Sequence, residues 1–168
     1  MSAQTTIRVE KKDKTVSVLL LKLQSMELLI PKIMVVDVLS WNDSDRISSA
    51  SYDAEWKLGE YGWKEEYIPL VCYEKLVGTE HCEDRMLKRK VVVIRSSQQP
   101  DQHYALHCKG FPKPLILTES SLNELSKQSD NYWLTHSMSI GSRILDIPDF
   151  AKLENSIWPQ ETKVSGTA

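Results

Sequence analysis

The stretch that decides the fold is Leu58–Leu70, which reads LGEYGWKEEYIPL. We interpret it as a glycine-rich turn that feeds a strand, with Pro69 ending the pairing because proline has no N–H to donate to a ladder. Because side chains alternate between the two faces of a strand, we expect Ile68, next to Pro69, to point into the protein core. Gly59 and Gly62 are followed by a strand, so the stretch lacks the helix N-terminus that would hold a phosphate.

Short apolar runs of the same kind recur on both sides of this stretch. They predict strands at residues 15–23, 26–31, 90–95, 102–108, 132–139 and 143–147. Turn signals recur about every ten residues, which favours sandwich or barrel architecture. A few single-turn helices are expected, the last over residues 149–154. The chain has no long amphipathic helix and no βαβ rhythm, so the sequence predicts an all-β protein.

Composition narrows the possible partners. The 168 residues carry a formal net charge of -2, which gives no basic excess for binding nucleic acid. The longest apolar runs are far too short to cross a bilayer, so we expect no direct membrane insertion. Three cysteines, Cys72, Cys82 and Cys108, are an odd number at irregular spacing. We therefore expect free thiols in a reducing cytoplasm.

Catalytic and metal-binding patterns are missing from the sequence. The four histidines and three cysteines form no Cys-x-x-Cys or His-x-x-x-His spacing, and adjacent His107 and Cys108 point to opposite faces of a strand. No nucleophile elbow, phosphate-binding loop or kinase signature occurs. We expect no enzyme, no cofactor and no metal. A cysteine-based redox sensor or a small β-barrel enzyme remains the alternative from another class.

Several motifs, in order along the chain, resemble those of CheW-like domains, the adaptors that couple chemoreceptors to a histidine kinase. In the decisive stretch Gly59, Trp63 and Ile68-Pro69 resemble the family signature, while Lys64 stands where the family usually has arginine and Glu65 where it has glycine. Three further segments resemble family elements: Val35-Val36-Asp37-Val38, Val91-Val92-Val93-Ile94 and the closing segment 140–153 (IGSRILDIPDFAKL). The altered polar positions indicate a divergent member.

The resemblance implies a fold and its boundaries. CheW-like domains consist of two five-stranded β-barrel lobes that share a hydrophobic core, with a few short helices. The resemblance places this domain at residues 14–155, with lobes at about 14–80 and 88–155. A polar segment, residues 1–13, precedes the domain, and a flexible C-terminal tail, residues 156–168, follows it.

The resemblance also implies a function. The expected role is that of a non-enzymatic coupling protein that links methyl-accepting chemoreceptors to a CheA-type histidine kinase. The first lobe would bind the kinase, and a groove between the lobes would grip the cytoplasmic tip of a receptor. Such a protein is cytoplasmic and is recruited to the inner membrane through receptor complexes. The divergence favours an accessory adaptor of a type IV pilus system that controls twitching motility, and an adaptor that has lost one partner is a further alternative.

The partner-binding residues that the resemblance implies are Val36, Asp37, Gly59, Trp63 and Lys64. In the family, an acidic residue and the signature arginine lie close together beside the receptor groove. Asp37 and Lys64 occupy those positions here, and lysine lacks the guanidinium fork that makes a bidentate contact. Two interpretations stay open for this pair: a surface ion pair, or two independently solvated side chains.

Overall fold

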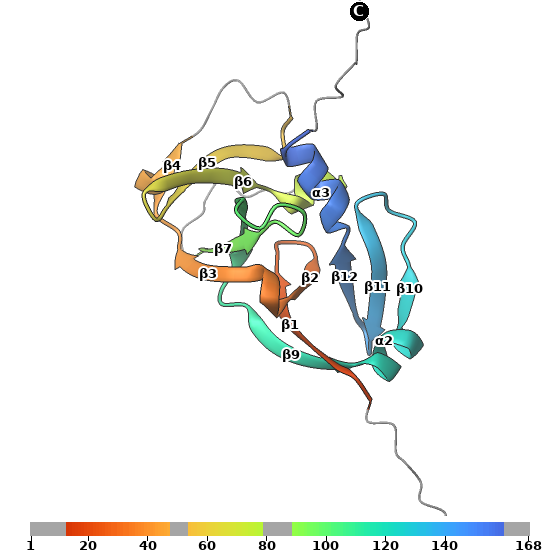
Figure 1. The fold of residues 1–168 in the computed structure, drawn as a ribbon. Helices are drawn as coiled ribbons and strands as arrows, with labels where there is room; N and C mark the ends of the chain where they lie inside the picture. The colour runs from red at the N-terminus through yellow and green to blue at the C-terminus, as the bar shows by residue number, and fades with distance from the viewer. Residues whose placement is uncertain (1–12, 48–53, 79–88, 160–168) are drawn as a thin grey trace, which may run out of the picture.

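Two six-stranded sheets make up most of the computed structural model, which describes residues 13–47, 54–78 and 89–159 (Figure 1). The first, which we call the terminal sheet, has the strand order β10 (Ser126–Gln128), β11 (Leu134–Ile140), β12 (Arg143–Pro148), β2 (Glu27–Pro31), β1 (Thr15–Lys22) and β9 (Lys113–Thr118). The second, the central sheet, has the order β3 (Val35–Ser40), β7 (Arg89–Arg95), β8 (His103–Lys109), β6 (Glu66–Val71), β5 (Lys57–Trp63) and β4 (Arg46–Ile47).

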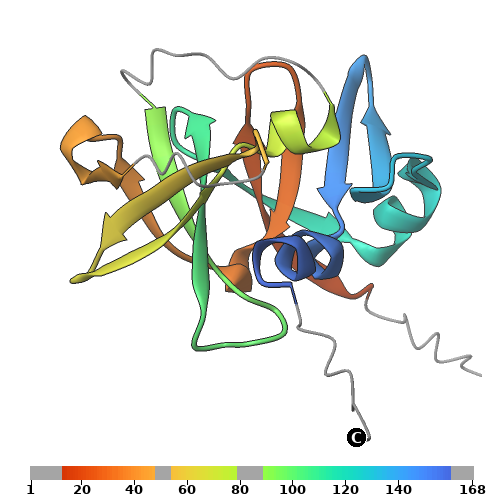
Figure 2. The ribbon, with the colours of Figure 1, turned by 90° about the horizontal axis from the view of Figure 1, so that it is seen from above.

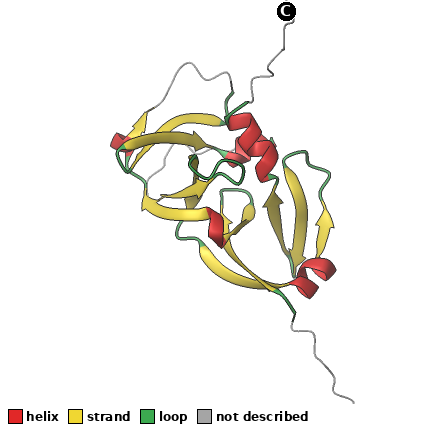
Figure 3. Cartoon of the chain, in the orientation of Figure 1, coloured by secondary structure: helices red, strands yellow, loops and turns green. Residues whose placement is uncertain are grey.

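The helices between these strands are short (Figure 3). They are η1 (Lys32–Met34), η2 (Asp43–Asp45), α1 (Tyr73–Val77), α2 (Glu119–Leu125) and α3 (Phe150–Ile157). The prediction of an all-β fold with a few short helices is therefore confirmed.

The division of the chain between the two sheets differs from the predicted lobes at 14–80 and 88–155. Each sheet takes strands from both halves of the chain: β1 pairs with β9, and β2 lies parallel to β12. In the central sheet β3 pairs with β7, and β6 lies parallel to β8. The apolar alternation of a strand fixes which face is buried but not which distant strand lies beside it, so the sequence could not fix this pairing. The predicted junction at residues 79–88 lies outside the described residues.

Three groups of buried side chains show how the two sheets share a core. On β7, Val91 and Val93 pack in a core that belongs to the central sheet alone. Val92 and Ile94, on the other face of the strand, pack in the core shared with the terminal sheet. On β2, Leu29 packs in a core that belongs to the terminal sheet alone, while Leu28 and Ile30 pack in the shared core. Strands buried on both faces have almost continuous apolar sequences. The shared core is formed by Leu21, Leu23, Leu28, Ile30, Val71, Tyr73, Leu76, Val92, Ile94, Tyr104, Leu106, Cys108, Leu134, Leu153 and Ile157.

The decisive stretch Leu58–Leu70 forms a β-hairpin whose turn is not at the glycines. The turn residues are Lys64 and Glu65, with φ of 46° and 62°, as a two-residue hairpin that follows the strand twist requires. The glycines instead lie within β5, where Gly59 has φ of 118° beside a register shift. Ile68 is 3% exposed, which confirms the strand phase. The strand does not end at the proline, because β6 continues to Val71.

The C-terminal tail predicted from residue 156 is wrong in its first residues. Helix α3 extends to Ile157, and Leu153 and Ile157 are both buried in the shared core. The ring of Trp158 then packs edge-on against Tyr104, with ring centroids 5.9 Å apart. Figure 2 shows α3 lying where the two sheets meet. The apolar residues at 150, 153 and 157 follow a helical spacing that carries the domain past residue 155.

Candidate functional site

A groove of about 1010 Å³ lies where the two sheets approach each other. The terminal sheet contributes the start of β1 and the end of β2, and η1 joins the two sides. The central sheet contributes β3, the tip of the β5–β6 hairpin, the end of β7 and the start of β8. The lining residues are Thr15, Val16, Ser17, Pro31, Lys32, Ile33, Val35, Val36, Trp63, Lys64, Arg95 and His103. We call this cavity the junction groove.

The chemistry of the junction groove combines apolar and cationic side chains. Ile33 is 85% exposed and Val16 is 41% exposed, so both present apolar surface to solvent. Lys32, Lys64 and Arg95 add three positive charges, and none of the described residues that line the groove carries a carboxylate. In a chain whose formal net charge is -2, this groove is a local exception. It suits a partner with an apolar stripe and nearby carboxylates.

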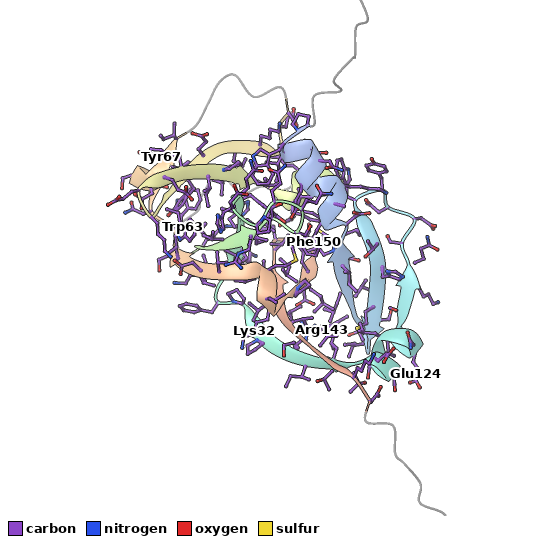
Figure 4. All side chains as sticks on the ribbon, viewed as in Figure 1. Lys32, Trp63, Tyr67, Glu124, Arg143 and Phe150 are labelled. Atoms are coloured by element: carbon purple, nitrogen blue, oxygen red, sulfur yellow. The ribbon has the colours of Figure 1, made fainter. Side chains whose placement is uncertain are left out.

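Three of the five residues predicted from the sequence line the junction groove: Val36, Trp63 and Lys64. The Lys64 ammonium lies 4.9 Å from the centre of the Trp63 ring, a cation–π arrangement. In the view of Figure 4, Trp63 and Lys32 lie on either side of β3. The hairpin turn places Lys64 at the end of β5, where its side chain is exposed.

Asp37 takes part in the groove through Trp63 and not through Lys64. Its Oδ2 accepts a hydrogen bond of 3.0 Å from Trp63 Nε1, and its Oδ1 accepts one of 2.9 Å from the Val38 amide. Within the described residues no ion pair joins Asp37 to Lys64. Asp37 therefore fixes the orientation of the indole ring, and Lys64 remains available to a partner.

Gly59 lies away from the other predicted residues. It lines a separate small pocket of about 130 Å³, together with Pro69 of β6 and Ile157 of α3. Its positive φ accompanies the irregular register near the start of β5, which gives it a backbone role.

Sequence reasoning missed the other nine lining residues of the junction groove, among them Arg95 and His103. Arg95 and His103 face each other at the loop end of the β7–β8 hairpin. The His103 ring lies 4.9 Å from the Trp63 ring, and its Nδ1 is buried without a hydrogen-bond partner. The sequence signal that could have identified these two residues is their position: Arg95 ends one predicted strand and His103 lies near the start of the next. That signal is weak, because polar residues are common at strand ends.

The described residues contain no group of three or more histidine, cysteine, aspartate or glutamate side chains that could hold a metal ion. None of the helices in these residues has the length and hydropathy that crossing a membrane requires. Cys72 and Cys108 are both fully buried. Burial raises the pKa of the Cys108 thiol to about 12. A redox sensor needs an exposed thiolate, so these two cysteines do not support that alternative, and Cys82 lies outside the described residues.

We expect Cys108 to be inert to thiol reagents in the folded protein. With a Cys72→Ser/Cys82→Ser variant, so that only Cys108 can react, labelling by dithionitrobenzoate at pH 8 should proceed only as fast as the protein unfolds. The raised pKa also means that the folded state holds this proton more tightly. Its contribution to stability is present below the unfolded pKa of about 8.5 and is lost as pH rises toward 12. Rapid, complete labelling without denaturant would contradict this.

The fold and the groove define the class of protein: a β domain of two sheets. The sheets share one core, each sheet has a further core of its own, and a groove lies where they meet. The model of the CheW-like domain matches residues 17–157, and the chain therefore belongs to the CheW-like domain family, whose members are scaffold and adaptor domains of chemosensory signalling.

A solved structure gives the same answer for the fold. The chain is similar to the scaffolding protein TtCheW from Thermoanaerobacter tengcongensis, with a TM-score of 0.63 and 11% sequence identity. The similarity covers 80% of this chain and 89% of that one. A search of curated protein sequences gave no match. The two chains thus share a fold at low sequence identity.

Proposed function

We propose that the protein is a non-enzymatic coupling protein that links methyl-accepting chemoreceptors to a CheA-type histidine kinase. The observation that carries this proposal is a CheW-like domain over residues 17–157 with an apolar and cationic groove between its two sheets. The protein acts in the cytoplasm and is recruited to the inner membrane through receptor complexes. It needs no cofactor and inserts into no membrane itself.

The junction groove is the proposed site for the tip of a receptor helix bundle. An α-helix with its side chains is about 10 Å across, and it can lay one apolar stripe into a groove. Val16, Ile33 and Val36 supply the apolar contacts for that stripe. Lys64 and Arg95 lie beside them and can pair with carboxylates on the flanks of the same helix.

The kinase is proposed to bind the outer part of the central sheet. Ile47 on β4 and Tyr67 on β6 are 43% and 59% exposed, so they offer apolar surface without disturbing the core. Modest surfaces of this kind suit exchangeable signalling interfaces. The lysine at position 64, in place of the arginine usual in the family, supports the assignment to an accessory adaptor, for which we propose a type IV pilus system and twitching motility as the output.

Affinity purification of the tagged chain from a lysate of its own organism, followed by mass spectrometry, tests the proposal. We expect recovery of both a methyl-accepting receptor and a CheA-type kinase. A pilus output predicts that these two proteins belong to the pilus system and not the flagellar one. Recovery of neither class would overturn the proposed function.

A charge reversal at Lys64 separates binding from stability. Lys64→Glu should weaken binding of a receptor-tip fragment by about fivefold or more, because it places a carboxylate opposite the partner's own carboxylates. The melting temperature should fall only slightly, since Lys64 is exposed, has no ion-pair partner within the described residues and loses only its cation–π contact with Trp63. Isothermal titration and thermal melts measure the two effects.

The matched control is Lys127→Glu, which makes the same charge change on the exposed strand β10, away from the groove. It should leave receptor binding within about twofold of the native value. If Lys64→Glu lost as much stability as binding, Lys64 would not belong to the site. The same conclusion would follow if Lys127→Glu weakened receptor binding as much as Lys64→Glu.

A further inference from the structure

A second concave surface lies outside the junction groove, and we call it the basic pocket. It has a volume of about 380 Å³ and is formed by the end of β1, the start of β2, the β8–β9 connection and the start of β12. Arg143, at the start of β12, is labelled in Figure 4. The lining residues are Leu20, Lys22, Glu27, Lys109, Gly110, Phe111, Lys113 and Arg143.

The charges of the basic pocket do not cancel. Glu27 is the sole carboxylate among the described residues that line it. Both of its oxygens accept hydrogen bonds from Arg143: Oε2 from Nε at 3.0 Å and Oε1 from Nη2 at 2.7 Å. In this bidentate ion pair the Arg143 guanidinium neutralises the negative charge of Glu27. Lys22, Lys109 and Lys113 are exposed, and the described residues provide no ion pair for any of them. Three positive charges therefore remain around one small cavity.

An exposed aromatic ring stands among these charges. Phe111 is 71% exposed, although phenylalanine is among the residues most often buried. The Lys90 ammonium lies 4.2 Å from the centre of its ring, which holds the ring against the end of the central sheet. The pocket thus presents one apolar anchor beside three unpaired lysines, the composition of an interface anchor with a charged rim.

We propose that the basic pocket docks an acidic segment of a partner protein, with carboxylates facing Lys22, Lys109 and Lys113 and an apolar side chain against Phe111. Charge complementarity selects this occupant. A polynucleotide is disfavoured because the chain as a whole has a formal net charge of -2 and the cations gather in a pocket instead of forming a stripe. The inference does not depend on the proposed receptor and kinase, because it uses a different surface.

A short fluorescein-labelled peptide of glutamates interspersed with leucines tests the proposal by fluorescence anisotropy at low salt. The full chain should bind it, and the variant Lys109→Glu/Lys113→Glu should bind about tenfold more weakly. The control Lys14→Glu/Lys127→Glu makes the same change of net charge on exposed residues outside the pocket, and it should change the affinity by less than about twofold.

Phe111 provides a second, independent readout. Phe111→Ala should weaken binding of the leucine-containing peptide several-fold, while a peptide with serine in place of leucine should bind the native chain and Phe111→Ala equally. Equal losses in the pocket and control double variants would overturn the proposal. So would tighter binding of a single-stranded oligonucleotide of equal charge, or self-association of the chain that the pocket variant abolishes.

Discussion

Ile68→Asp should strongly destabilise the protein. Ile68 is 3% exposed and belongs to the core of the central sheet, where it packs with Tyr61, Leu70 and Val91. The substitution removes apolar burial and leaves a carboxylate without a partner in that core, at a cost of about 4 kcal/mol or more. Domains of this size have only about 5–15 kcal/mol of stability in total. Far-ultraviolet circular dichroism and urea unfolding measure the loss.

Tyr67→Asp is the matched control for this experiment. Tyr67 precedes Ile68 on β6, so its side chain points to the other face of the sheet, and it is 59% exposed. The same new charge at this position should lower the free energy of unfolding by less than about 1 kcal/mol. A folded Ile68→Asp variant with a native midpoint would show that the strand phase of β6 is wrong.

Glu154→Ala should be the next most damaging change. Glu154 is 2% exposed and accepts hydrogen bonds from the Ser97 amide and the Ser97 hydroxyl, both at 2.7 Å, and from the Tyr104 hydroxyl at 3.4 Å. These contacts tie α3 to the loop between β7 and β8. Alanine leaves the donors unsatisfied, and we expect a loss of about 3 kcal/mol. Glu154→Gln keeps one acceptor oxygen and should lose less.

The loop that Glu154 holds connects Arg95 to His103, both of which line the junction groove. Hydrogen exchange of the Ser97 amide should therefore accelerate in Glu154→Ala, which reports on the loop directly. The control is Glu124→Ala on the exposed face of α2, expected within about 0.5 kcal/mol of the native protein. Equal stabilities of the two alanine variants would contradict the role given to Glu154.

Local sequence patterns were enough to predict the positions of strands, but not which strands pair. The continuous apolar run Val91–Ile94 indicated a strand, and its burial on both faces follows from its position between two cores. The pairing of β1 with β9 could not be predicted, because it depends on long-range packing that leaves no local mark. The turn at Lys64-Glu65 was missed because neither residue is a typical choice for positive φ, whereas the nearby glycines are.

The candidate site was predictable only where the family motifs reach it. Val36, Trp63 and Lys64 come from motif positions, and the structure brings these residues together in one groove. The role of Asp37 as an acceptor for the indole N–H required the geometry of two neighbouring strands. His103 comes from the far end of another hairpin, and no motif marks it.

The most direct test of the adaptor role is sedimentation of a purified receptor signalling fragment with the purified kinase, with and without this chain. The account predicts that the kinase sediments with the receptor only when the chain is present, and that Lys64→Glu reduces the amount recovered. Equal sedimentation of the kinase in the absence of the chain, or a chain that binds neither protein, would contradict it.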